Sequence, residues 1–329
     1  RFTSAYTNSP ICVPARASWA TGRYVHAIGY WDNAHAYDGR IRGWGHRLQG
    51  EGIPVNAIGK LHYRNATDPT GFDSQTEPMH IADGIGQVWG SVRDPLPEMQ
   101  ARAAGGGLLA KAGPGLSSYN RFDARIADTA CARLRDAAGD PDGGPWVLYL
   151  GFVAPHFPLT VPEEFHALYP PDDLSLPKLD PRDGHERHPW IQSRPNLRGA
   201  EPPSPELNRK GLAAYLGLCT FIDAEIGRVL GVLEETGLAA STRVVYTSDH
   251  GDNAGTRGLW GKGNFYTESA GIPLIVAGPD VPEGAVRRTP VTLVDSYQTI
   301  LDCVGLTPTE EERDLPGRSW FKIAGEADA

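Results

Sequence analysis

The residue types that could do chemistry gather in a few short segments of this 329-residue chain. Near its start, Cys12, Pro14 and Arg16 stand at alternate positions. A thiol becomes a nucleophile and a metal ligand once it is ionised. Arg16 follows Cys12 by one helical turn, so on a helix its guanidinium would share a face with the sulfur.

The other chemically capable side chains each follow an apolar run or a glycine-rich turn. They are Lys60 and His62, His156, Asp249 and His250, and Lys262. An aspartate beside a histidine is a suitable ligand pair for a divalent cation. Histidines suit proton transfer because their ordinary pKa is about 6.5. Lysines present compact positive charges that can clamp an anion.

The elements that must position these residues alternate along the chain. Short apolar runs predict strands at 53–58, 146–153, 243–247 and 273–277, and helical periodicity predicts helices at 16–22, 40–50, 121–138, 207–236 and 294–304. The alternation predicts an α/β fold with a mainly parallel central sheet flanked by helices on both faces. The run at 146–153 is continuously apolar, which predicts a strand covered on both faces.

The order of strands and polar motifs predicts where the site lies. Lys60 and His62, His156, and Asp249 and His250 each come directly after a predicted strand. Ligands of open α/β sheets bind at the carboxyl ends of the strands. We therefore expect these side chains to converge at one edge of the sheet.

Composition excludes several classes of function. The chain has 31 basic and 40 acidic residues, and its net charge of -9 disfavours a nucleic-acid partner. No apolar run approaches the roughly 18 residues that cross a membrane. Four scattered cysteines predict buried thiols in a reducing cytoplasm rather than a disulfide framework. The composition looks bacterial.

We expect one catalytic α/β domain over residues 1–329, with two long excursions. The segments at about 68–115 and 170–205 are rich in Pro, Gly and Asp, and we expect them to wall a substrate pocket. The chain opens at Arg1 in sequence that resembles the end of a strand, so we expect an N-terminal strand to precede it.

Taken together, six segments resemble one family, the type I sulfatases of the alkaline-phosphatase-like superfamily. They are C-x-P-x-R at 12–16, G-K-x-H at 59–62, P-H-x-P at 155–158, S-D-H-G-[DE] at 248–252, the lysine segment 258–262 with 268–275, and 294–301 with the G-R-S turn at 315–319. The segments 6–10 and 32–34 are similar to the choline-sulfatase and phosphonate monoester hydrolase branch.

The resemblance implies that Cys12 is oxidised by a maturing enzyme to formylglycine, whose hydrate is the nucleophile. It implies that Arg16 orients this group. Asp249 and His250, with residue 12, would bind one divalent cation, for which Ca²⁺, Mn²⁺ and Mg²⁺ all stay open.

Further roles follow from the same resemblance. Lys60 and Lys262 would clamp the sulfate oxygens, His156 would protonate the leaving oxygen, and His62 would take a proton from the diol. Asn33 would lie near the sulfate.

The implied activity is the hydrolysis of small sulfate esters. The same machinery would serve a phosphonate monoester or phosphodiester hydrolase, because all these substrates carry one charge. A different class stays open as well. The family carries acidic metal ligands on a first strand and a C-terminal subdomain, both of which we expect to be missing here, so the chain could be a non-catalytic fragment that binds anions or a partner. The sequence also leaves open the leaving group and self-association into a homo-oligomer.

Overall fold

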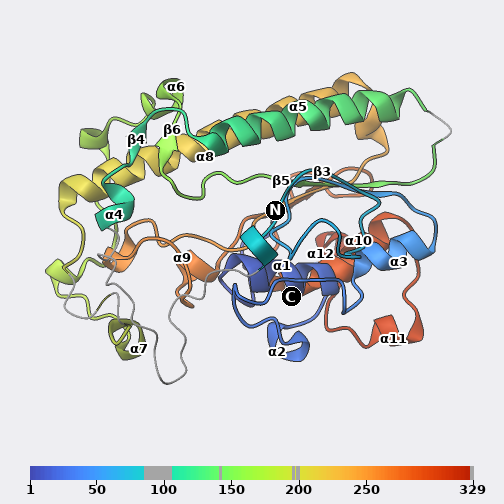
Figure 1. Ribbon diagram of the computed structural model, residues 1–329, viewed down its shortest axis with the longest axis horizontal. Coiled ribbons are helices and arrows are strands. Elements are labelled where there is room, and N and C mark those ends of the chain that lie inside the picture. The colour runs from blue at the N-terminus through green and yellow to red at the C-terminus, as the bar shows by residue number, and fades with distance from the viewer. Residues whose placement is uncertain (85–105, 141–142, 195–196, 198–200, 327–329) are drawn as a thin grey trace.

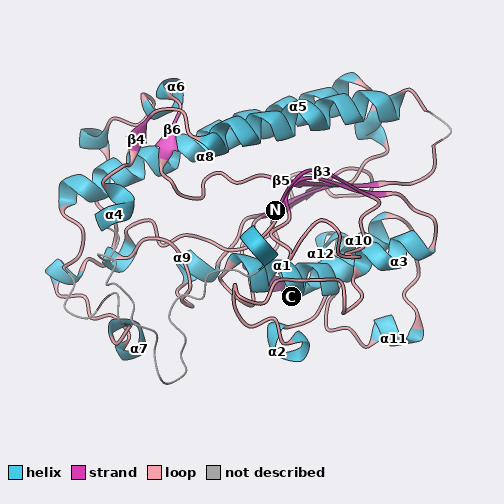
Figure 2. Ribbon diagram, viewed as in Figure 1, coloured by secondary structure: helices cyan, strands magenta, loops and turns pink. Residues whose placement is uncertain are grey.

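The computed structural model describes residues 1–84, 106–140, 143–194, 197 and 201–326 (Figure 1). Short strands lie near the middle of the molecule, with long helices on one side and shorter helices on the other (Figure 2). The predicted α/β class is confirmed, and the main difference from the prediction is in how the strands pair.

Three parallel strands form the largest sheet, in the order β3-β2-β5. β2 (Val55–Lys60) is central, and its register pairs Val55 with Val147 and Gly59 with Gly151 of β5 (Val147–Gly151). Its other neighbour is β3 (Ser74–Met79). Residues 68–115 were expected as a surface excursion, yet this segment supplies an edge strand of the sheet.

Two further strands form a separate antiparallel pair. β7 (Val244–Thr247) runs against β8 (Leu274–Ala277), with Val244 opposite Ala277. The mainly parallel sheet therefore describes β2, β3 and β5, and β7 and β8 depart from it.

Two long helices cover one face of the strands. α5 (Ser118–Ala138) begins with a serine cap, in which Ser117 Oγ accepts from the Asn120 N–H at 3.1 Å. α8 (Pro205–Glu235) begins with a proline in its first turn, where its missing N–H costs nothing. Ile126 of α5 and Val229 of α8 pack with Ile58 of β2 in one apolar cluster.

Shorter helices cover the opposite face. These are α1 (Cys12–Thr21), α3 (Trp44–Gly50), α10 (Ser296–Cys303) and α12 (Trp320–Gly325). Trp44 and Leu48 of α3 pack with Tyr297 and Leu301 of α10 against Val55 of β2. The central strand is thus buried between two helical layers, as the sequence predicts.

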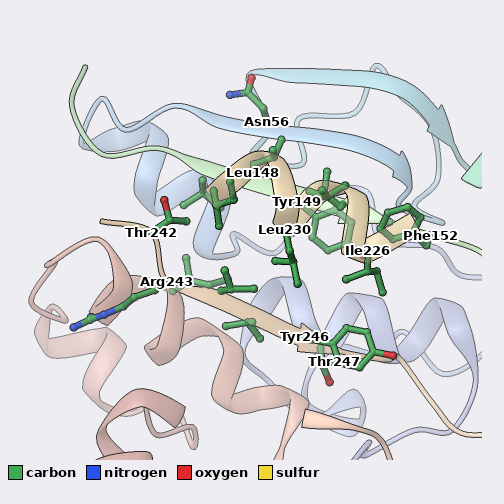
Figure 3. A pocket seen from close by; sticks show the side chains of 18 of the residues that line it. Asn56, Leu148, Tyr149, Phe152, Ile226, Leu230, Thr242, Arg243, Tyr246 and Thr247 are labelled. Carbon is green, nitrogen blue, oxygen red and sulfur yellow. The ribbon is translucent and has the colours of Figure 1, made fainter. Parts of the chain in front are cut away.

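A cavity of about 2020 Å³ separates the two sheets (Figure 3). Leu148 and Phe152 approach it from the β5 side, and Ile226 and Leu230 approach it from α8. The prediction that residues 146–153 form a fully covered strand is wrong: 147–150 are only half-buried. The reason is that β5 is an edge strand, and one side of it faces this cavity.

Short elements complete the fold. The remaining strands are β1 (Ala5–Tyr6), β4 (Gly113–Pro114), β6 (Thr160–Val161) and β9 (Val291–Thr292), and the remaining helices are α2 (Val25–Ile28), α4 (Gly106–Leu109), α6 (Glu163–His166), α7 (Pro189–Gln192), α9 (Thr267–Ala270) and α11 (Glu310–Arg313). None of the helices in the described ranges is long and apolar enough to cross a membrane. Parts of the two expected excursions, 85–105, 195–196 and 198–200, lie outside the described residues.

Candidate active site

Cys12 is the first residue of α1 and is 2% exposed. The predicted helix began at Arg16, but the observed helix begins four residues earlier, at Cys12. Pro14 falls in its first turn, where proline is tolerated. Asn33 Oδ1 accepts a hydrogen bond from the Val13 N–H at 3.3 Å. It thereby satisfies one of the amides that a helix start leaves without a partner. Asn33 is thus placed beside Cys12 at the start of α1.

Arg16 is buried one turn further along α1 and connects three elements. Its Nε donates to Asp249 Oδ2 at 2.8 Å, and its Nη1 donates to the Lys60 carbonyl oxygen at 2.8 Å and to the Tyr149 hydroxyl at 3.0 Å. Burial alone would raise the pKa of Asp249, but His250 and Arg16 hold it well below its usual range. The aspartate is therefore an anion.

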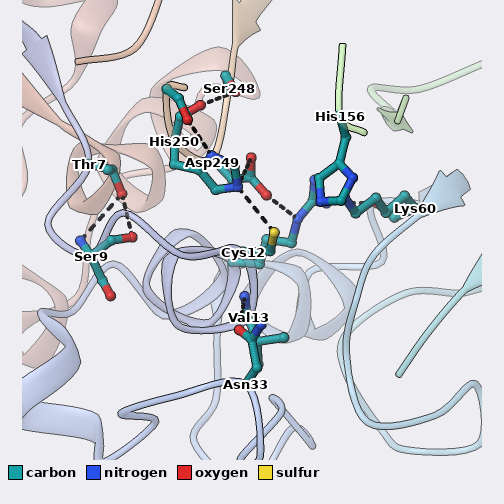
Figure 4. Close-up of polar contacts among 12 residues, drawn as sticks. Thr7, Ser9, Cys12, Val13, Asn33, Lys60, His156, Ser248, Asp249 and His250 are labelled. Carbon is teal, nitrogen blue, oxygen red and sulfur yellow. Dashed lines mark hydrogen bonds and ion pairs between the residues drawn. The ribbon is translucent and has the colours of Figure 1, made fainter. Parts of the chain in front are cut away.

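Three ligand atoms converge where α1 meets the loop after β7 (Figure 4). Ligand atoms of Cys12, Asp249 and His250 all lie within 4.8 Å of one another. His250 Nε2 is 3.1 Å from Cys12 Sγ and 3.5 Å from Asp249 Oδ1. His250 Nδ1 lies 2.8 Å from the Gly251 carbonyl oxygen, which can only accept, so Nδ1 carries a proton; Nε2, on the other side of the ring, presents a lone pair when the ring is neutral.

This donor set fits a divalent cation. An imidazole nitrogen, a carboxylate and an ionisable sulfur lie close together, and a cation between them would satisfy all three. Arg16 supports the set from outside by holding Asp249. Cys12, Asp249 and His250 are the three residues that the resemblance implies as metal ligands.

The carboxyl end of β2 delivers two more predicted residues. Lys60 is the last residue of β2 and is 4% exposed, and burial lowers the pKa of its ammonium group. His62 follows in the left-handed backbone region, at φ 59°, which is uncommon for a residue other than glycine. The His62 N–H donates to the Met79 carbonyl oxygen at 2.8 Å, so β3 helps to hold this turn.

The carboxyl end of β5 delivers His156. Its N–H donates to the Val153 carbonyl oxygen at 3.0 Å, and its Nδ1 lies 2.7 Å from the Phe157 carbonyl oxygen. Since that carbonyl can only accept, Nδ1 carries the proton and Nε2 is left to face the site. Burial, followed by the charges of Lys60 and Lys262, lowers the pKa of His156 to about 4 although a hydrogen bond with Cys12 opposes the shift.

Lys262 lies on a loop whose backbone is hydrogen-bonded by the carboxylate of Asp252. Asp252 Oδ1 accepts from the N–H groups of Ala254 at 2.8 Å and Gly261 at 3.0 Å. The Gly263 N–H donates to the Pro10 carbonyl oxygen at 3.0 Å, which ties this loop to the segment before α1. The Lys262 ammonium lies 5.3 Å from the centre of the Phe157 ring.

The positive charges act together on residue 12. Burial alone would raise the pKa of the Cys12 thiol, but Lys60, His250 and Lys262, and a contact with His156, bring it well below its usual value. The pocket therefore favours negative charge at this position. The same charges would favour an anionic ligand bound beside residue 12.

Part of the expected wall packs against the lysine loop. Arg187 Nε donates to the Arg257 carbonyl oxygen at 2.7 Å, and the His188 N–H donates to the Tyr266 hydroxyl at 2.8 Å. Arg194 Nη1 donates to the Gly263 carbonyl oxygen at 3.3 Å. The excursion at 170–205 thus supports the segment that carries Lys262.

The structure brings the predicted residues to one place, and it adds two that the sequence did not reveal. These are Tyr149 and Asp123, which contact Arg16 and the turn before His156. No motif marks either of them, since their partners are backbone groups or residues distant in sequence. Asp252, the last position of the motif at 248–252, was given no role from the sequence, and the structure shows that it holds the Lys262 loop. Asp123 does leave one signal, because it falls on the buried stripe of its helix with Ile126 and Ala130.

Comparison with known proteins now identifies the family. The Sulfatase family model matches residues 1–306. The chain belongs to the sulfatase family. A choline-sulfatase from Rhizobium meliloti (strain 1021) is 30% identical over 321 residues, which cover 94% of this chain and 61% of that protein.

Two further proteins are similar to this chain. Arylsulfatase K from Xenopus laevis is 28% identical over 319 residues, covering 93% of this chain and 56% of that protein. The phosphonate monoester hydrolase SpPMH from Silicibacter pomeroyi superimposes with a TM-score of 0.72 at 26% identity, covering 100% of this chain and 70% of that chain. This sulfatase-family chain spans about three fifths of the length of the curated relatives it matches.

Proposed function

We propose that this chain hydrolyses sulfate monoesters through a nucleophile made from Cys12. The observation that carries the proposal is the convergence of Cys12, Asp249 and His250, whose ligand atoms lie within 4.8 Å of one another, in a pocket that Lys60 and Lys262 make positive. That arrangement offers a nucleophile position, a cation site and two charges for the oxygens of an anion.

A divalent cation held by Asp249, His250 and an oxygen of the matured residue 12 would supply Lewis-acid polarisation. The chain's own residues would do the rest of the chemistry. Lys60 and Lys262 would neutralise the ester's non-bridging oxygens, and Arg16 would keep Asp249 in place. The candidate cations are Ca²⁺, Mn²⁺ and Mg²⁺.

The reaction divides into two steps. One hydroxyl of hydrated formylglycine at residue 12 would attack sulfur and lose its proton to solvent, the bond from sulfur to the leaving oxygen would break, and a protonated His156 would give its proton to that oxygen. The second hydroxyl would then lose its proton to His62. The bond from carbon to the sulfate oxygen would break, so that sulfate leaves and the aldehyde is restored, and water would add to the aldehyde to form the hydrate again. The negative charge of a bound ester would offset the charges of Lys60 and Lys262, which lower the pKa of His156. The ester would thereby help His156 to hold the proton that it donates.

Phosphonate monoesters are the second candidate substrate. The likeness to the SpPMH hydrolase, at 26% identity and with a TM-score of 0.72, favours them. Both substrate classes are anions with one charge, so the charge of the pocket suits either of them.

Residue 12 needs a maturing enzyme, which would oxidise the thiol to an aldehyde. We also propose a reducing compartment, the cytoplasm, since all four cysteines are unpaired in this fold.

The test combines mass spectrometry with paired kinetics. In protein made beside a formylglycine-generating enzyme, the Cys12 peptide should be lighter by about 18 Da. The same sample should cleave 4-nitrophenyl sulfate faster than 4-nitrophenyl phenylphosphonate, each assayed with Ca²⁺, Mn²⁺ or Mg²⁺ added. The matched control, Cys12→Ala, should lose activity on both. The reverse preference would favour the phosphonate reading, and no turnover by fully converted protein would favour a non-catalytic, anion-binding role.

A further inference from the structure

Asp123 is a second carboxylate near the site. It does not contact Cys12, and it is more deeply buried than Asp249. Asp123, in the second turn of α5, is 0% exposed. Its Oδ1 accepts from the Val153 N–H at 2.7 Å and its Oδ2 accepts from the Ala154 N–H at 2.8 Å. A buried aspartate is costly unless its oxygens are hydrogen-bonded, so this placement calls for an explanation.

The two amides belong to the turn that presents His156. They follow the end of β5, and Val153 also accepts the N–H of His156 through its carbonyl oxygen at 3.0 Å. Asp123 therefore fixes both sides of the residue to which the His156 backbone is bonded. The next contact is His156 Nδ1 with the Phe157 carbonyl oxygen at 2.7 Å, which sets the ring's orientation.

The side chain at this position must accept twice. A carboxylate has two acceptor oxygens and no donor, whereas an asparagine of the same shape turns one NH₂ group toward a backbone N–H. Two donors facing each other inside the protein leave both groups unsatisfied. The charge of Lys60 favours the ionised form of Asp123. Lys60 ends β2, which is the strand that pairs with β5.

We propose that Asp123 is a positioning residue for the reaction: by holding the Val153 and Ala154 amides, it sets where His156 Nε2 meets the leaving oxygen. It acts through His156 and does not touch the substrate itself. The inference rests on the proposed function, since it assigns Asp123 to the same hydrolysis. Asp123 is not among the site residues that the sequence predicted.

The kinetic test uses Asp123→Asn with Asp128→Asn as its control. Asp128 lies on the same helix with its side chain 62% exposed. We expect Asp123→Asn to lower kcat by about 10-fold to 100-fold with KM nearly unchanged. The loss should be larger for alkyl sulfates than for 4-nitrophenyl sulfate, because only a poor leaving group needs the proton. Asp128→Asn should match the parent.

A double-variant comparison separates positioning from general destabilisation. If Asp123 acts through His156, then Asp123→Asn should cost little in a His156→Ala background on an alkyl sulfate. Independent, multiplying losses in the two backgrounds would overturn the proposal. An equal loss for every leaving group, or a rise in KM with kcat unchanged, would overturn it as well. Should Asp123→Asn not fold, Asp123→Ser carries the same comparison.

A structural readout keeps this test apart from that of the proposed function. In Asp123→Asn, the Val153 and Ala154 amides should exchange with solvent faster, and the ¹⁵N shifts of the His156 ring should change. Unchanged amides and ring shifts would refute the positioning role whatever the enzyme cleaves. A parent that is inactive on sulfates but shows these changes in the variant would contradict the proposed substrate and not the role of Asp123.

Discussion

Arg16 shows how one buried side chain can join several elements of a site. The sequence predicts that it orients residue 12, and the structure places its guanidinium on Asp249, on the Lys60 carbonyl oxygen and on the Tyr149 hydroxyl. A planar fork with several fixed donors can make these contacts together, whereas a lysine cannot. Arg16 thereby ties α1 to the end of β2, to the middle of β5 and to the loop after β7.

The raised pKa of the Asp123 carboxyl predicts that the stability of the fold depends on pH. Burial raises the pKa of its carboxyl from 3.8 to about 6, although the Ala154 and Val153 amides and Lys60 oppose the shift, and Glu225 of α8 adds to it. The folded state thus holds the proton more tightly than the unfolded state. This contribution to stability is complete below about pH 4 and is lost as the pH rises through about 6.

The measurement is urea unfolding of the parent and Asp123→Asn between pH 4.5 and 8. The parent's free energy of unfolding should fall relative to the variant's as the pH rises, by up to about 3 kcal/mol. Asp128→Asn should follow the parent at every pH. A parent that gains stability over Asp123→Asn across this range would contradict the raised pKa.

At the scale of elements, a glycine allows two strands to meet at the site. A Cβ placed on Gly151 of β5 would lie 2.1 Å from the Lys60 carbonyl oxygen. That oxygen accepts from Arg16, so a side chain here would push on the same contact that fixes Asp249. No neighbouring flexible side chain can absorb the change, because the obstacle is backbone.

Gly151→Ala should therefore cost stability and activity together. We expect a loss of about 1–3 kcal/mol in unfolding free energy and a fall in kcat of about tenfold or more. Gly50→Ala at the end of α3 is the matched control, because a Cβ there meets nothing within 4 Å. Thermal unfolding and kcat of both variants check this, and equal behaviour of the two would refute the steric argument.

The elements also show where sequence reasoning works and where it stops. β2, β5, β7 and β8 were predicted within about two residues, since each is an apolar run ended by polar residues. β3 was missed because Ser74–Met79 carries no apolar alternation and lies at an edge, where little needs burying. The motif residues were found because their types are unusual, while Asp123 and Tyr149 were missed because their roles depend on distant partners.

At the scale of the molecule, the two sheets differ in how well their strands are paired. β2 has a neighbour on each side, whereas β7 pairs only with β8 among the described strands. The wall of the cavity between the sheets includes half-exposed apolar and aromatic side chains, such as Leu230 at 39% and Tyr246 at 38%. The sequence could not predict this, because an apolar run does not reveal whether its strand lies at the centre or the edge of a sheet.

This difference predicts a ranking in native-state hydrogen exchange. The amides of β2 should exchange only when the whole domain unfolds, since both edges of the strand are bonded. Along β7, the amides that point toward β8 should be protected, and the alternate amides that point toward the cavity should exchange faster than those of β2 by a factor of about 10 or more. Mass spectrometry or NMR of exchanged protein measures this. If all β7 amides were as slow as those of β2, the free edge of β7 would have to be covered in solution, and the two sheets would then behave as one.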